Sequence, residues 1–152
     1  MTLHRLHRTQ TLAVDRDTAW AFFSDPMNLA AITPPWLGFR VTTPNPGPMF
    51  AGQILTYTVR ALPGVRVSWV TEITHVREPD FFVDEQRLGP YRLWHHQHLF
   101  RSVPGGTEME DVVHYALPFW PLGEAVRGIV ASRLEAIFEY RRQALAGMFG
   151  PV

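Results

Sequence analysis

The residues best suited to chemistry in this chain are two histidines in the segment Arg92 to Phe100, which reads RLWHHQHLF. In a β-strand, side chains alternate between two faces, so His96 and His98 would share one face with Trp94 and Phe100. Imidazole groups can exchange hydrogen bonds, move a proton near neutral pH or bind a metal ion. Two imidazoles between aromatic rings on an inward face predict a lined cavity more than a purely apolar core.

Carboxylates on the neighbouring strands fall on the same predicted face. Short turns predict registers that place His96 beside Asp84 on one side and opposite Asp111 on the other. Buried carboxylates and imidazoles are tolerable where they hydrogen-bond to each other. We therefore predict a polar cluster within a ligand-binding wall, whose members are Trp69, Thr71, Phe82, Asp84, Gln86, Trp94, His96, His98, Phe100, Met109, Asp111, Tyr115 and Ile137.

This cluster is compatible with several kinds of chemistry. His96 and Asp111 are the candidate catalytic pair, since a carboxylate that holds an imidazole can position it to move a proton. Two histidine nitrogens and a carboxylate could also bind a metal ion. Cupins, however, place a glutamate a few residues after their His-x-His pair, and Ser102 and Val103 stand there in this chain. We predict neither a metal nor a cofactor.

The remaining alternative is that the network satisfies only its own hydrogen bonds or lies on a solvated outer face. The sequence contains no nucleophile motif, phosphate-binding loop or cofactor fingerprint that would define an enzyme class.

The elements before the histidine segment follow from turn residues and capping signals. Residues 3–14 predict a first strand, Asp15 caps a helix that continues to Phe23, and Pro26 to Ile32 predicts a second short helix. A brief strand is expected at 39–43. Residues 44–48 predict a loop, because their three prolines cannot donate to a strand ladder.

The rest of the chain changes from strand to helix periodicity. Strands are predicted at 53–61, 65–77, 80–88, 92–101 and 107–116, and their short connections make them an antiparallel meander. In the last hairpin, Phe100 is expected opposite Thr107 across a loop at 102–106. Apolar residues at spacings of three and four then predict one long helix over 122–149, in which Gly123 and Gly128 weaken the first turns.

Together these elements predict an α+β fold in which a curved antiparallel sheet wraps around a long C-terminal helix. We expect a single domain over residues 1–152, since this length suits one hydrophobic core. A curved sheet that packs against one helix leaves space between them. That space is the predicted cavity.

Composition narrows the choice of partner. Lys plus Arg and Asp plus Glu each number 14, so no net charge draws the chain to nucleic acid or anionic lipid. The chain has no cysteine, which excludes disulfides and thiolate chemistry. We expect a cytoplasmic protein, because no signal peptide or apolar run of about 20 residues is present.

Four segments resemble the SRPBCC superfamily, the helix-grip fold: FFSDPMNLAAITPPWLGF, QRLGPYRLWHHQHLF, TEMEDVVHYALPFWPLG and LEAIFEYRR. This superfamily includes START lipid-transfer domains, the birch pollen allergen group and polyketide aromatase/cyclases. The chain is most similar to small bacterial ligand-binding members described as cell-division-inhibitor-like, some of which are joined to a sugar-nucleotide epimerase-like domain.

The resemblance implies a cavity between the final helix and the concave sheet. It would be entered near the loops Leu62 to Val65, Leu88 to Tyr91 and Pro118 to Leu122. The resemblance further implies an epimerase-like partner protein. Whether the chain forms a homodimer is left open by the sequence. The superfamily has no universal catalytic residue, so it assigns no catalytic role here.

We therefore predict that the chain binds a small hydrophobic or amphipathic molecule as a carrier or sensor. The alternative is a polyketide cyclase/dehydratase-like enzyme that uses the His/Asp pair as acid and base. A third class is an interaction module, for which exposed aromatic residues at Trp36, Phe119 or Trp120 would form the interface.

Overall fold

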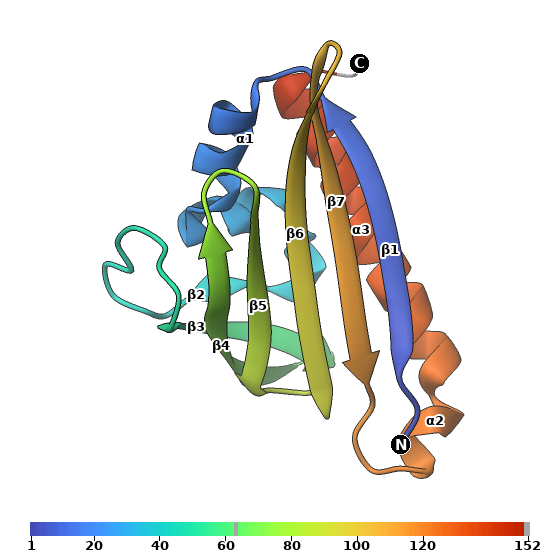
Figure 1. Ribbon diagram of the computed structural model, residues 1–152. Helices are drawn as coiled ribbons and strands as arrows, with labels where there is room; N and C mark the ends of the chain where they lie inside the picture. The colour runs from blue at the N-terminus through green and yellow to red at the C-terminus, as the bar shows by residue number, and fades with distance from the viewer. Residues whose placement is uncertain (63, 151–152) are drawn as a thin grey trace.

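A strongly curved antiparallel sheet forms most of the molecule and faces one long helix (Figure 1). The computed structural model describes the backbone of residues 1–62 and 64–150 and the side chains of 1–60 and 64–150. Within that part, the sheet order is β1-β7-β6-β5-β4-β3-β2. The strands are β1 (His4–Leu12), β2 (Arg40–Val41), β3 (Gln53–Leu62), β4 (Val65–Arg77), β5 (Phe81–Leu88), β6 (Leu93–Val103) and β7 (Gly106–Ala116).

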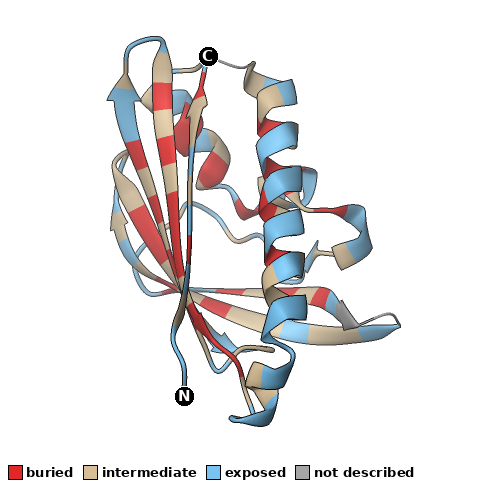
Figure 2. Cartoon of the chain, turned by 90° about the vertical axis from the view of Figure 1, so that its right-hand side faces the viewer, coloured by how far each residue is buried: buried red, intermediate tan, exposed pale blue. Residues whose placement is uncertain are grey.

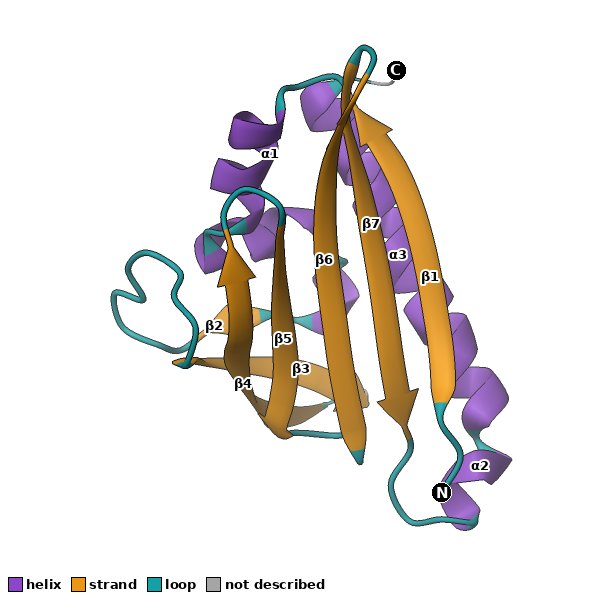
Figure 3. Ribbon diagram, in the orientation of Figure 1, coloured by secondary structure: helices purple, strands orange, loops and turns teal. Residues whose placement is uncertain are grey.

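The helices lie at two points in the chain order (Figure 3). Helix α1 (Arg16–Phe23) and the 3₁₀ helices η1 (Pro26–Ile32) and η2 (Pro35–Leu37) connect β1 to β2. The short α2 (Leu122–Ala125) and the long α3 (Arg127–Phe149) follow β7. This arrangement confirms the predicted helix-grip α+β fold.

Capping explains where the first helices begin. The Asp15 side chain accepts a hydrogen bond from the backbone N–H of Thr18, and Asp25 accepts one from the N–H of Met27. The predicted bounds of both segments are confirmed, although the second is a 3₁₀ helix. The brief strand predicted at 39–43 is shorter than expected, since only Arg40–Val41 pairs with β3.

The prediction of one unbroken terminal helix is wrong. Val126 ends α2 and precedes α3 with a backbone conformation outside the helical range. Gly123 and Gly128 stand on either side of this break, and glycine is a poor helix former. The weakness expected in the first turns therefore becomes an interruption.

The predicted register of the β6–β7 hairpin is also wrong, by two residues. Phe100 pairs with Met109 rather than Thr107, and His98, not His96, lies opposite Asp111. The turn is tighter than predicted, because Val103 already pairs with Gly106. A shift of two positions keeps every side chain on its predicted face.

The pairing of β5 with β6 is as predicted. Asp84 lies opposite His96, and Phe82 lies opposite His98. The buried positions alternate along β6 and include Trp94, His96, His98 and Phe100, so the inward face is the predicted one. Figure 2 shows buried positions as red bands along the strands and along α3.

Helix α3 is buried mainly along its second half. Its buried residues are Leu134, Phe138, Arg141 and Leu145, whereas Ile129 in the first turn is exposed. Among the described residues, no helix combines the length and apolar character needed to cross a membrane. The buried side chains from Leu134 to Leu145 attach α3 to the rest of the fold.

Candidate functional site

A cavity of about 670 Å³ lies between the concave face of the sheet and α3. Its wall is mostly apolar and rich in aromatic rings, among them Phe39, Tyr57, Trp69, Tyr91, Trp94 and Phe138. Small-molecule sites in proteins usually measure roughly 300–1,000 Å³ and combine apolar walls with a few polar groups. The cavity has the size and character of such a site.

Most of the predicted ligand-contacting residues line this cavity. They are Trp69, Thr71, Phe82, Asp84, Trp94, His96, His98 and Ile137. Strand periodicity brings the members on β4, β5 and β6 to one face, and Ile137 lies on the facing side of α3. That any of them contacts a ligand stays a prediction.

Phe100 and Met109 do not line the cavity, and the expectation that they would is wrong. Both belong to a core cluster with Trp20 and Phe23 of α1. The ring of Phe100 lies edge to face with that of Trp20, with centroids 5.8 Å apart. Helix α1 covers this end of the sheet, so inward-facing residues there pack in a solid core.

Gln86 and Tyr115 also lie outside the cavity wall. The Gln86 side chain donates to the carbonyl of Tyr91 at 2.7 Å and accepts from its N–H at 3.1 Å, so it ties down the β5–β6 turn. Tyr115 belongs to a buried cluster with Leu6 and Leu134. Both side chains are therefore engaged in contacts behind or beside the wall.

Asp111 is 2 % exposed and does not form part of the wall. It lies beneath the two imidazoles of the cavity wall and contacts both. His96 Nε2 is 2.8 Å from Asp111 Oδ1, and His98 Nδ1 is 3.5 Å from the same oxygen. Asp111 was expected to line the ligand-binding wall. It lies behind the wall instead, where it contacts His96 and His98.

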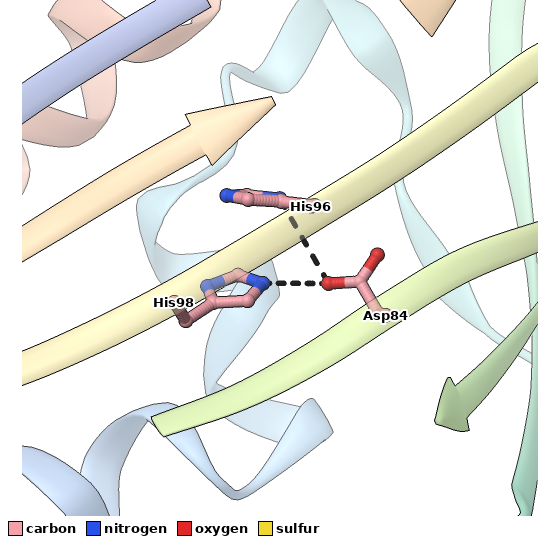
Figure 4. Close-up of side chains that lie close together, drawn as sticks. All are labelled: Asp84, His96 and His98. Carbon is pink, nitrogen blue, oxygen red and sulfur yellow. Dashed lines mark hydrogen bonds and ion pairs between the residues drawn. The ribbon is translucent and has the colours of Figure 1, made fainter. Parts of the chain in front are cut away.

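The two histidines and two aspartates form a closed ring of polar groups. His98 Nε2 is 2.5 Å from Asp84 Oδ2, and His96 Nδ1 is 3.8 Å from that oxygen (Figure 4). The imidazole rings stack with centroids 3.7 Å apart. Each imidazole therefore lies between both carboxylates, and the ring joins β5, β6 and β7.

Burial and neighbouring charges set the protonation of this ring. Burial raises the pKa of Asp84 and of Asp111, but hydrogen bonds from the imidazoles and the charge of Arg141 outweigh it, so each pKa lies below its usual range. Burial and the neighbouring His96 lower the pKa of His98 to about 4. At neutral pH both carboxylates are ionised acceptors, so Nε2–H of each histidine donates to its carboxylate.

The sequence interpretation missed Arg141 of α3, which lines the cavity beside this ring. Its Nη2 is 3.3 Å from Asp111 Oδ1, and Arg141 is 9 % exposed. The signal was present in the helix periodicity, since Arg133, Ile137 and Arg141 recur at intervals of four.

Tyr57 of β3 was also missed. It is buried in the cavity wall, and burial followed by the charge of Asp84 raises its pKa. Its hydroxyl is therefore neutral at physiological pH and adds a further polar group to the wall. The alternation of side chains along β3 could have indicated this position, because Tyr57 shares a face with Leu55 and Val59.

Two of the predicted entrance loops reach the cavity. Pro90 and Tyr91 line it from one loop, and Pro118, Phe119 and Leu122 line it from the other. Phe119 is 83 % exposed, so it lies at the mouth of the cavity. The third predicted loop, Leu62 to Val65, includes Pro63, which lies outside the described residues.

The aromatic residues considered for an interface differ in their surroundings. Trp36 is partly exposed and lies under the guanidinium of Arg133, 5.0 Å from its ring centroid. Trp120 is 62 % exposed and does not line the cavity.

The polar ring also contains the group most similar to a metal site. Asp84, His96 and His98 place one potential ligand atom each within 4.8 Å of one another. His98 Nε2 already donates to Asp84 within this group, however, and the positive charge of Arg141 is close by. These neighbours oppose the binding of a cation.

Solved structures share this fold at low sequence identity. Protein Ms6760 from Mycobacterium smegmatis is 18 % identical, with a TM-score of 0.68 over 97 % of this chain and 96 % of that one. Protein CV1439 from Chromobacterium violaceum is 16 % identical, with a TM-score of 0.68 over 100 % of both chains. Ara h 8.0201 is 14 % identical, with a TM-score of 0.61 over 96 % of this chain and 99 % of that one.

No curated protein matches the chain. The model of one protein family, described as polyketide cyclase / dehydrase and lipid transport, matches residues 12–138. This is an SRPBCC-type family, which agrees with the resemblance found in the sequence. The match covers most of the chain, and the helix-grip fold with its lined cavity agrees with it: the chain belongs to the polyketide cyclase / dehydrase and lipid transport family.

Proposed function

We propose that residues 1–152 act as one domain that holds a small, mostly apolar molecule in the cavity, as a carrier or sensor. The observation that carries this proposal is the 670 Å³ cavity with aromatic walls and one cluster of polar groups. Burial of roughly 300 Å² of apolar ligand surface would contribute about 7 kcal/mol before the cost of lost motion. The His/Asp ring would set the orientation of the bound molecule.

The test uses N-phenyl-1-naphthylamine, a neutral apolar dye whose fluorescence rises in apolar surroundings. The wild-type protein should bind it with a one-to-one ratio. Ile137→Trp places a larger side chain in the cavity wall and should weaken binding at least tenfold. Ala136→Trp is the matched control, since Ala136 is exposed on the same helix, and it should leave binding unchanged.

Native mass spectrometry of the protein purified from its own host provides the second arm. A retained lipid, quinone or polyketide would support the carrier role. Absence of dye binding together with the absence of any retained molecule would reject it.

A second candidate function is catalysis of the cyclase/dehydratase type, favoured by the hydrogen bond between His96 and Asp111 beside the cavity. An imidazole held by a carboxylate can accept a proton from the carbon between two carbonyl groups, which is the first step of such a ring closure or dehydration. Turnover of a β-keto substrate that His96→Ala abolishes, with dye binding retained, would favour the enzyme over the carrier. Binding without turnover would leave the carrier role.

A further inference from the structure

Arg141 is a buried cation whose hydrogen-bonding groups are unused. A guanidinium carries five N–H donors, and leaving buried donors without acceptors is unfavourable. Within the described part of the chain, Nε and Nη2 of Arg141 have no hydrogen-bond partner. The same side chain lines the cavity. Nε and Nη2 are shielded from solvent, so a molecule in the cavity would meet the guanidinium first at Nη1 and complete its hydrogen bonding from there.

The surroundings of Arg141 hold the guanidinium in place without using its donors. The guanidinium carbon lies 5.3 Å from the ring centroid of Phe23 and 5.7 Å from that of Phe138. Its nearest carboxylate oxygen, Asp111 Oδ1, already accepts a hydrogen bond from His96. The aromatic rings fix the position of the group, and Asp111 retains its charge. What remains is a positioned donor group at the cavity wall.

Arg141 is the more buried of the two arginines in the wall, since Arg133 is only partly buried. Asp84 accepts its hydrogen bond from His98, and Arg133 lies over Trp36, which is partly exposed. A planar guanidinium binds carboxylates through two parallel hydrogen bonds, which a point charge cannot do. We propose that Arg141 binds an anionic oxygen group, such as a carboxylate, on a ligand that is otherwise apolar. This proposal rests on the proposed function and names the class of ligand.

The test compares two probes of equal chain length, decanoate and 1-decanol, by titration calorimetry at pH 7.5. A purely apolar cavity would favour the alcohol, because a carboxylate loses more hydration on burial. The proposal requires the opposite order, with decanoate bound at least tenfold more tightly by the wild-type protein. Equal binding, or tighter binding of the alcohol, would overturn it while leaving the proposed function intact. If neither decanoate nor decanol binds, the result counts against this proposal and against the proposed function.

Variants of two adjacent arginines then locate the effect. Arg141→Gln should weaken binding of decanoate at least tenfold and of decanol less than twofold. Arg142→Gln removes the same charge from the next position, where the side chain is exposed and bonded to Glu139, and should change neither. Arg141→Lys keeps the charge but not the planar fork and should give an intermediate loss. If Arg141→Gln does not fold, the proposal is tested by the preference of the wild-type protein for decanoate and by the weaker binding of decanoate to Arg141→Lys.

Discussion

His96 Nε2 lies 2.8 Å from Asp111 Oδ1, although the strand ladder places Val113, not Asp111, opposite His96. The hydrogen bond therefore runs diagonally from β6 to β7. His98 makes the equivalent diagonal bond to Asp84 on β5, whereas its direct neighbour on β7 is Asp111. The two diagonals have opposite directions, so the imidazoles hold three strands together across the cavity wall.

Loss of one carboxylate from this ring should destabilise the fold. Asp111→Asn leaves Arg141 without its charge partner and weakens the bond from His96, which should lower the free energy of unfolding by about 3 kcal/mol. Urea unfolding at pH 7.5 measures this. Glu110→Gln is the control on the same strand, because its partner His7 is solvent-accessible, and it should cost less than about 1 kcal/mol. If Asp111→Asn is as mild as the control, the ring has no structural role.

The lowered pKa of His98 predicts acid sensitivity. The unfolded chain takes up a proton near pH 6.5, whereas folded His98 does so only near pH 4. The unfolded state therefore binds more protons between these values, and stability falls as the pH falls through this range. Between pH 7.5 and 5.0 the expected loss is about 2 kcal/mol. The lowered pKa values of Asp84 and Asp111 extend the loss to more acidic pH.

Urea unfolding at the two pH values in His98→Gln checks this assignment. The variant should lose most of the difference in stability between pH 7.5 and 5.0. His75→Gln, at an exposed position on β4, should retain it. An unchanged pH difference in His98→Gln would assign the effect to another group.

Phe100 and Trp69 should separate stability from binding. Phe100 packs against α1 outside the cavity, so Phe100→Leu should lower stability by about 1–2 kcal/mol and leave the affinity for N-phenyl-1-naphthylamine unchanged. Trp69 lines the cavity, with its ring centroid 5.3 Å from that of Trp94. Trp69→Leu should weaken dye binding by about 1 kcal/mol, or roughly fivefold. Equal effects of both variants on affinity would contradict the placement of Phe100 in the core and of Trp69 in the cavity wall.

The Asp84, His96 and His98 group should not retain a metal ion. A cation would have to displace the proton that His98 Nε2 donates to Asp84, and Arg141 adds a positive charge nearby. Elemental analysis of the purified protein should find less than one-tenth equivalent of zinc or nickel, and added zinc should leave the melting temperature within about 1 °C. One equivalent of bound metal, lost in His98→Gln, would show that this expectation is wrong.

The fold could be predicted because periodicity and turn residues agreed along the chain. β4 has the predicted bounds, and β6 presents the predicted face to the interior. The hairpin register could not be settled from the turn alone, since a loop of two residues and one of five both suit the glycines near Pro104. The predicted inward and outward faces are still correct, because the register error is two residues and strand side chains alternate with a period of two.

The candidate site was predicted only in part because strand alternation states which face is inward but not what covers it. Phe100 and His96 share a face, yet α1 covers one and leaves the other at a cavity. Arg141 could not be assigned from its residue type, since arginine on a helix is usually exposed. Its spacing of four from Ile137 places it on the same stripe of the helix, but whether that stripe meets a cavity depends on how α3 crosses the sheet.

The uneven burial of α3 has a dynamic consequence. The buried positions Leu134, Phe138, Arg141 and Leu145 hold the helix from its eighth residue onward, while Ile129 and Val126 near its start are exposed. The break at Val126 lies between this exposed first turn and α2, which follows β7. The first turn of α3 therefore has less buried contact than residues 134–145, and we expect its backbone amides to exchange with solvent faster.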